Sequence, residues 1–267
     1  MKQRKGFVHI WLILLVLVLT IIGFAGWRIA SKHKQSGKSK TSLASGSNQS
    51  HGGLLYLKSI GFHIDNYDPA TNHAGDMVFT HEDHDLSDVS NEILSDFGTQ
   101  DPRSPNDPTK RNPQPTFILP LGTKVLSLVD GTVANIEGLY SGDSTIMVTS
   151  DGNKYGNYIY ETEHIVNPIV KIGDKVKGGQ VIGEVSTHGS QYHPGFGIVE
   201  IGILHPDGNR ATHICPYHYL DSSIKTDVQN KILNIHKAWM DYTGLHSLYH
   251  DDTAAEPGCS SLNPVNG

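Results

Sequence analysis

The sequence lacks several features that would place it in a common class of protein. It has no excess of basic residues: 27 acidic residues against 21 Lys and Arg give a net charge of −6, which argues against binding a nucleic-acid backbone. It contains neither an HExxH motif nor the spacing of an EF-hand loop. Only two cysteines occur in 267 residues, so the cysteine pairs of a zinc knuckle are missing. These absences exclude nucleic-acid partners and the metal sites that short motifs encode.

A hydrophobic run occupies residues 7–27. These 21 residues carry no charged side chain, and a helix of that length crosses the hydrocarbon core of about 30 Å. Trp11 and Trp27 are suited to the membrane interfaces. A cleaved signal peptide has a shorter apolar region and a small-residue cleavage site. We therefore predict an uncleaved single-pass helix that anchors the protein to the membrane.

The orientation of this helix does not follow from charge alone, because lysines and arginines flank both of its ends. Its place at the extreme N-terminus and the even number of cysteines favour an extracytoplasmic C-terminal part. As a disulfide, Cys215 and Cys259 would close a loop of about 45 residues. Two unrelated buried thiols are the alternative.

Composition and patterning divide the chain into six regions. We expect a short N-terminal tail (1–6), the transmembrane helix (7–27), a flexible linker rich in Ser, Gly, Lys and Asn (28–53), an extension of strands and loops (54–115), a β-domain (116–220), and a C-terminal helix with a tail (221–267). The fold class is mainly β.

The C-terminal helix is predicted from apolar residues at helical spacing between Ile224 and Trp239. Asp221 and Ser222 are suited to cap its start, and Gly244 marks its end. The apolar stripe indicates packing against the sheet rather than a partner surface.

The β-domain contains an internal quasi-repeat. The segments "GTKV" at Gly122–Val125 and "GDKV" at Gly173–Val176 lie 51 residues apart, and each precedes a turn and another strand. Asp151-Gly152 predicts a hairpin turn between them. Two similar β-hammerheads that face each other would form a small barrel-sandwich.

Four stretches of this domain, "PLGTKVLSLVDGTV", "YGNYIYETEHI", "VKIGDKVKGGQVIGEVS" and "GFGIVEIGI", carry a resemblance to a known family. They resemble the duplicated-hybrid-motif catalytic domain of lysostaphin-type zinc endopeptidases, which cut peptidoglycan cross-bridges. The resemblance covers about a third of the chain and implies the barrel-sandwich fold. It says less about activity, because lipoyl, biotinyl and membrane-fusion adaptor domains share the "VKxGDxVxxGQxIG" element.

The resemblance also implies where zinc ligands would lie. The first two ligands, a His and an Asp before the "PxGT" turn, would fall at Asn112 and Thr116. The third ligand is the second His of an "HxH" strand motif. That motif reads Phe196-Gly197-Ile198 here, so the third ligand would fall at Ile198. All three standard ligands are therefore replaced. The family's catalytic "YxHL" histidine has a counterpart in His164, which is the one candidate catalytic residue.

A relocated metal site is the alternative. Its candidate ligands are His164, His188, His193 and Glu200, together with Glu161 or Glu163. Strand alternation places Glu161 and Glu163 on one face and His164 on the other. Solvated or structurally hydrogen-bonded side chains would explain the same residues without a metal.

We therefore expect a membrane-anchored, non-catalytic protein whose peptidase-like domain binds the cell wall or a surface protein. No cofactor is expected, with zinc as the alternative. A zinc-metallopeptidase-like hydrolase with a relocated site is the second hypothesis. A transport adaptor is the third, and it is disfavoured because residues 133–170 lack the heptads of the coiled-coil hairpin that adaptors insert.

Overall fold

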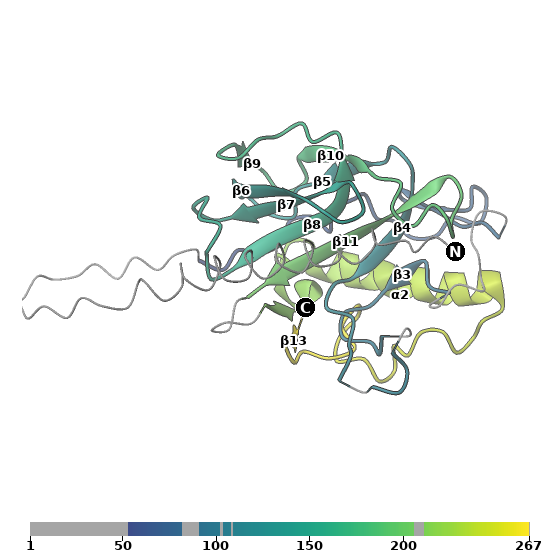
Figure 1. The fold of residues 1–267 in the computed structure, drawn as a ribbon. Coiled ribbons are helices and arrows are strands. Elements are labelled where there is room, and N and C mark those ends of the chain that lie inside the picture. Colours follow the sequence, from purple (N-terminus) through teal and green to yellow (C-terminus); the bar gives the residue numbers. More distant parts are fainter. Residues whose placement is uncertain (1–52, 82–90, 102–103, 108, 206–210, 267) are drawn as a thin grey trace, which may run out of the picture. The chain divides into compact units, whose positions relative to one another are not determined.

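The computed structural model describes residues 53–266, except 82–90, 102–103, 108 and 206–210 (Figure 1). The predicted N-terminal tail, the predicted transmembrane helix and all but Gly53 of the predicted linker lie outside these residues. Among the residues described, no helix combines the length and the apolar character that a membrane span needs.

The described residues form a mainly β fold with one α-helix, as predicted. The elements in the extension and the first half of the domain are β1 (His73–Ala74), β2 (Met77–Val78), β3 (Leu94–Ser95), β4 (Thr116–Pro120), β5 (Lys124–Leu126), β6 (Gly131–Gly138) and β7 (Ser144–Thr149). Those that follow are β8 (Ile159–Val166), β9 (Lys175–Val176), β10 (Val181–Val185), β11 (Phe196–Leu204), β12 (Thr212–Ile214), the 3₁₀ helix η1 (Pro216–Tyr219), α2 (Lys225–Thr243) and β13 (Val265–Asn266).

The quasi-repeat forms two units that exchange their short strands. The short strand of the first unit, β5, pairs with β10 of the second, and the short strand of the second unit, β9, pairs with β6 of the first. Backbone hydrogen bonds extend both exchanges: Val185 N–H donates to the carbonyl of Thr123, and Val133 N–H donates to that of Asp174. The two hammerheads therefore complete each other, which agrees with the predicted barrel-sandwich.

The hairpin predicted at Asp151-Gly152 is present, because it connects β7 to the antiparallel strand β8. Gly152 adopts a φ of 82°, a left-handed conformation that glycine adopts without steric cost. The N–H of Gly152 donates a hydrogen bond to the Thr149 hydroxyl at 2.9 Å.

Strand β11 lies at the centre of the sheet, between β8 and β4 (Figure 1). Its first half pairs with β4 and its second half with β8. Glu200 stands where the two halves meet, opposite both Thr116 and Glu163. The meeting point of these three strands brings Glu200 close to Glu163 and His164.

The predicted C-terminal helix is α2, and its apolar stripe faces the core as expected. Val228, Ile232, Ile235 and Trp239 are buried. The predicted cap is wrong, however: no side chain caps the first turn, because the Asp221 carboxylate accepts hydrogen bonds from Ser223 instead. Gly244 ends the helix in the left-handed conformation.

The segment after α2 is tied to the domain by the predicted disulfide between Cys215 and Cys259. Both cysteines are buried. Next to this link, Phe97 exchanges backbone hydrogen bonds with Gly258 and Ser260. The C-terminal segment is thus part of the folded unit.

Candidate functional site

Two of the three positions that the resemblance assigns to zinc ligands carry side chains with other roles. The Asn112 amide donates hydrogen bonds to the Ser95 hydroxyl at 3.1 Å and the Asp96 carbonyl at 3.0 Å. The Thr116 hydroxyl donates to the carbonyl of Gln114 at 3.3 Å. An amide nitrogen is not a zinc ligand, and zinc sites in proteins are built from Cys, His, Asp and Glu.

The third position, Ile198, is apolar and closely packed. A Cβ atom added to Gly189 would lie 2.5 Å from Ile198 Cδ1, so the turn presses directly on this side chain. The first histidine of the "HxH" motif is replaced by Phe196, which is buried. The residues that the resemblance places at the zinc-ligand positions therefore do not fit the ion.

The family's catalytic histidine has a partner that the sequence did not indicate. His164 is buried, and its Nδ1 lies 3.1 Å from the carboxylate of Asp143, which follows the β6–β7 turn. The hydroxyls of Ser186 and Ser141 each donate to the same carboxylate at 2.5 Å. These contacts fix the plane of the imidazole ring and direct Nε2 away from Asp143.

The charges of this dyad follow from its surroundings. Burial lowers the pKa of His164, and the charge of His188 acts in the same direction, so the imidazole is neutral near pH 7. Burial raises the pKa of Asp143, but the hydrogen bonds from Ser141 and Ser186 and the contact with His164 outweigh burial and lower it. A neutral imidazole that donates Nδ1–H to an ionised carboxylate keeps an Nε2 lone pair for a ligand or a proton.

His164 also leaves the face of β8 that strand alternation predicts for it. Between the pairs Ser144–Ile165 and Ile146–Thr162, β8 advances by one residue more than β7, which is a β-bulge. The extra residue falls at His164, whose φ of 63° is left-handed. The bulge turns the ring toward the face of Glu163, so the predicted placement on the opposite face is wrong.

This rotation creates a cluster of three ligand-type side chains. One atom each of Glu163, His164 and Glu200 can be chosen so that all three lie within 4.8 Å of one another. Burial raises the pKa of Glu163 to about 8, and the charges of Glu161 and Glu200 add to this effect. Two carboxyl oxygens and one imidazole nitrogen can bind a divalent cation or move a proton.

Glu161, another predicted ligand, lies elsewhere on the same face and has its own partners. Its carboxylate is buried 2.5 Å from His213 Nε2, and it accepts a hydrogen bond from the Gln114 amide at 3.1 Å. Gly202 makes room for this pair, because a Cβ there would lie 2.8 Å from the carboxylate. Glu161 therefore belongs to a buried structural pair rather than to the three-residue cluster.

The two histidines of the turn occupy different positions. The ring of His188 stacks on His164 with centroids 3.7 Å apart, and it stands perpendicular to the exposed Tyr140 ring with centroids 6.0 Å apart. His193 is buried, and its backbone N–H bonds to the carbonyl of Gly189. Neither contributes to the three-residue cluster found among the described residues.

A second cluster, formed by Asp96, His236 and Asp251, was not anticipated from the sequence. Burial lowers the pKa of His236, but the contacts with the carboxylates of Asp251 and Asp96 outweigh burial and raise it to about 9. The available signal was the position of His236, which falls within the apolar stripe of α2. A histidine on a buried face needs a partner, although the sequence does not say which.

The exchanged short strands and the position of His164 beside the central strand define a peptidase-like hybrid-motif domain. The model of Peptidase family M23 matches residues 116–202. This part of the chain is therefore an M23 peptidase domain, in agreement with the resemblance to lysostaphin-type enzymes.

Two solved structures illustrate the similarity. One is a mutant catalytic domain of the prophage-encoded M23 protein EnpA from Enterococcus faecalis: identity is 23%, the TM-score is 0.35, and the alignment covers 46% of this chain and 85% of that one. The other is lysostaphin from Staphylococcus simulans, with 20% identity, a TM-score of 0.34, and coverage of 49% and 50%. The chain thus spans half the length of lysostaphin. No curated protein matches it.

Proposed function

We propose that the protein is anchored in the membrane by residues 7–27 and that its extracytoplasmic M23 domain binds cell-wall peptides without cutting them. The observation that carries this proposal is the state of the three inherited ligand positions. Asn112 is hydrogen-bonded to the strand of Ser95, Thr116 to its own backbone segment, and Ile198 is packed under a turn. The scaffold of the peptidase is kept while its metal site is replaced by structural contacts.

Three aromatic rings, those of Tyr140, His188 and His164, lie in a row that leads from the surface to the site. Tyr140 is 89% exposed and stands perpendicular to the ring of His188, which in turn stacks on the buried His164. Beside the last ring lie the carboxyl groups of Glu163 and Glu200. Aromatic faces that lead to a few convergent polar groups are typical of ligand sites. The Glu200 carboxylate at the end of the row suits the protonated amine of a wall peptide.

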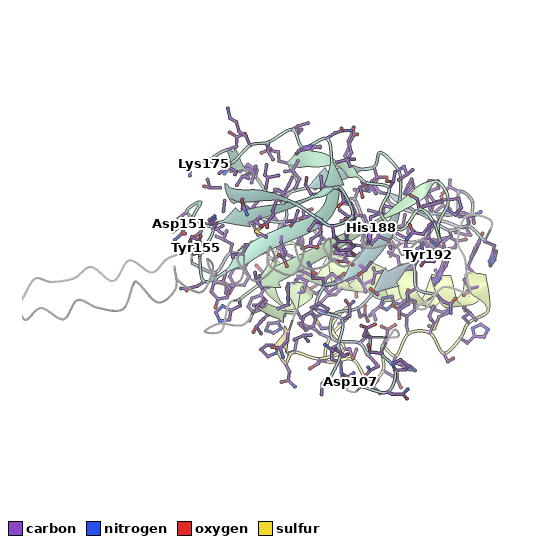
Figure 2. The ribbon with its side chains drawn as sticks, in the orientation of Figure 1. Asp107, Asp151, Tyr155, Lys175, His188 and Tyr192 are labelled. Atoms are coloured by element: carbon purple, nitrogen blue, oxygen red, sulfur yellow. A yellow bond between two sulfur atoms is a disulfide. The ribbon has the colours of Figure 1, made fainter. Side chains whose placement is uncertain are left out.

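The binding proposal is tested by co-sedimentation with purified peptidoglycan sacculi. We expect Tyr140→Ala and Glu200→Gln to weaken binding by about tenfold, which corresponds to about 1.4 kcal/mol. Tyr155→Ala is the matched control: Tyr155 is also exposed, and Figure 2 shows it at the other end of the β-domain from His188. Equal losses in all three variants, or no sedimentation of the parent protein, would contradict the proposal.

A second candidate function is hydrolysis at a relocated metal site formed by Glu163, His164 and Glu200. The observation that favours it is the orientation of His164, whose Nδ1 is held by Asp143 while Nε2 is left for a ligand. In this case His164→Ala and Glu200→Gln would abolish cross-bridge cleavage without unfolding the protein. Parent protein that binds sacculi and leaves their cross-bridges intact selects the first candidate.

A further inference from the structure

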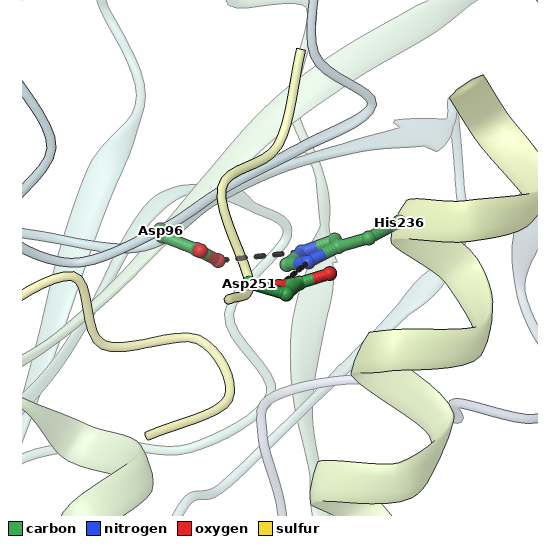
Figure 3. Close-up of side chains that lie close together, drawn as sticks. All are labelled: Asp96, His236 and Asp251. Atoms are coloured by element: carbon green, nitrogen blue, oxygen red, sulfur yellow. Dashed lines mark hydrogen bonds and ion pairs between the residues drawn. The ribbon is translucent and has the colours of Figure 1, made fainter. Parts of the chain in front are cut away.

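The cluster of Asp96, His236 and Asp251 lies outside the M23 segment and joins three separate parts of the chain (Figure 3). Asp96 follows β3, His236 belongs to α2, and Asp251 comes from the segment after the helix. His236 is completely buried and Asp96 is 6% exposed. The Tyr249 ring stacks on the imidazole with centroids 3.9 Å apart and nearly parallel planes, which fixes the orientation of the imidazole.

The two ring nitrogens of His236 have different environments. Nδ1 lies 2.7 Å from Asp251 Oδ1, in a good hydrogen bond. Nε2 lies 3.3 Å from Asp96 Oδ1 in an ion pair, but both of these atoms are buried and their contact lacks the geometry of a hydrogen bond. Buried polar atoms without a hydrogen bond are rare in native proteins and call for an explanation.

We propose that a divalent transition-metal ion, represented by zinc, binds His236 Nε2 and Asp96 Oδ1, and that Asp251 orients the histidine. Ligand atoms about 2.1 Å from a tetrahedral ion are ~3.4 Å apart, which agrees with the 3.3 Å between Nε2 and Oδ1. A carboxylate on the second nitrogen is the usual support for a metal-bound histidine. The Asp251 side chain is 24% exposed, whereas the His236 side chain is completely buried.

The ligand set also indicates what kind of ion fits. One imidazole nitrogen and carboxylate oxygens, with no thiolate, suit Zn²⁺ or Mn²⁺ better than Cu⁺. The two carboxylates together carry two negative charges. A protonated His236 would neutralise only one of them, whereas a bound dication would neutralise both. The ion would link β3, α2 and the segment that ends at the Cys215–Cys259 disulfide, so its role is to hold these parts of the fold together.

The test is metal binding by the full chain after removal of metals with a chelator. We expect about one equivalent of zinc by elemental analysis and a rise in the thermal midpoint on adding zinc. Asp96→Asn is expected to lose the ion, and Asp251→Asn to weaken binding by about 10- to 100-fold. Glu200→Gln is the matched control, because it alters the other cluster and is expected to keep the ion.

Two results would overturn the proposal. One is a parent protein that binds no zinc and shows no visible absorption bands with Co²⁺, a measurement that does not depend on the folding of any variant. The other is zinc binding that survives Asp96→Asn but disappears in Glu200→Gln, which would place the ion beside His164. Because sacculus binding is measured separately, the first result does not bear on the proposed binding function, whereas the second would favour the relocated metal site of the second candidate function.

Discussion

Removal of the Cys215–Cys259 disulfide is expected to lower the free energy of unfolding by about 4 kcal/mol. The bond joins residues 44 positions apart, and a loop of this length constrains the unfolded chain strongly. It also holds the segment that carries Asp251 and the backbone contacts of Phe97 with Gly258 and Ser260. The double variant Cys215→Ala/Cys259→Ala should therefore unfold at a lower denaturant concentration.

The measurement is urea unfolding of the parent and the double variant, each with and without a reducing agent. Reductant should destabilise the parent and leave the double variant unchanged, which separates the cross-link from the loss of buried sulfur atoms. A parent whose unfolding curve is the same with and without reductant would show that the bond does not stabilise the fold.

Glu163→Gln is expected to stabilise the protein by about 2–3 kcal/mol at pH 8.5 and to leave it unchanged near pH 4.5. In the folded protein the pKa of Glu163 is about 8, raised by burial and by Glu161 and Glu200 from an ordinary value of 4.5. Stability from this group is fully present below pH 4.5 and is lost as the pH rises to about 8, because only the unfolded state releases the proton. A pKa that differs by one between the folded and unfolded states corresponds to about 1.4 kcal/mol. The expected stabilisation is smaller than the whole pKa difference would give, because the Glu163 side chain keeps some contact with solvent.

The measurement is the free energy of unfolding against pH, with a chelator present. Burial also raises the pKa of Glu92 to about 8, so Glu163→Gln should keep part of the slope and a double variant with Glu92→Gln should lose more of it. Parallel curves for the parent and Glu163→Gln would contradict the protonation state that we assign to the cluster.

The local elements of the fold were predictable because local patterns encode them. Helix α2 follows from one apolar stripe ended by Gly244, and the β7–β8 hairpin from Asp151-Gly152. The two "G-x-K-V" segments indicated two similar units. That β5 and β9 each complete the other unit depends on long-range pairing, which a repeat alone does not specify.

The site was predictable only in part, for a related reason. His164 and Glu200 were identified, but alternation put His164 on the wrong face because the bulge exists only in the register between β7 and β8. Asp143 was not predicted as the partner because it reaches His164 from the connection between β6 and β7 rather than from the strand of His164. His236 was hidden in an apolar stripe, and its two partners lie 140 residues before it and 15 residues after it.

We propose that this M23 domain has lost the family's zinc chemistry, because Asn112, Thr116 and Ile198 stand at the positions of its ligands. The most direct test is an assay of the purified chain on cross-linked peptidoglycan with zinc present, counting newly exposed amino groups, with lysostaphin as the positive control. We predict no release above the rate without protein, together with retained binding to the sacculi. Zinc-dependent release of amino groups that disappears in His164→Ala would contradict this loss of zinc chemistry.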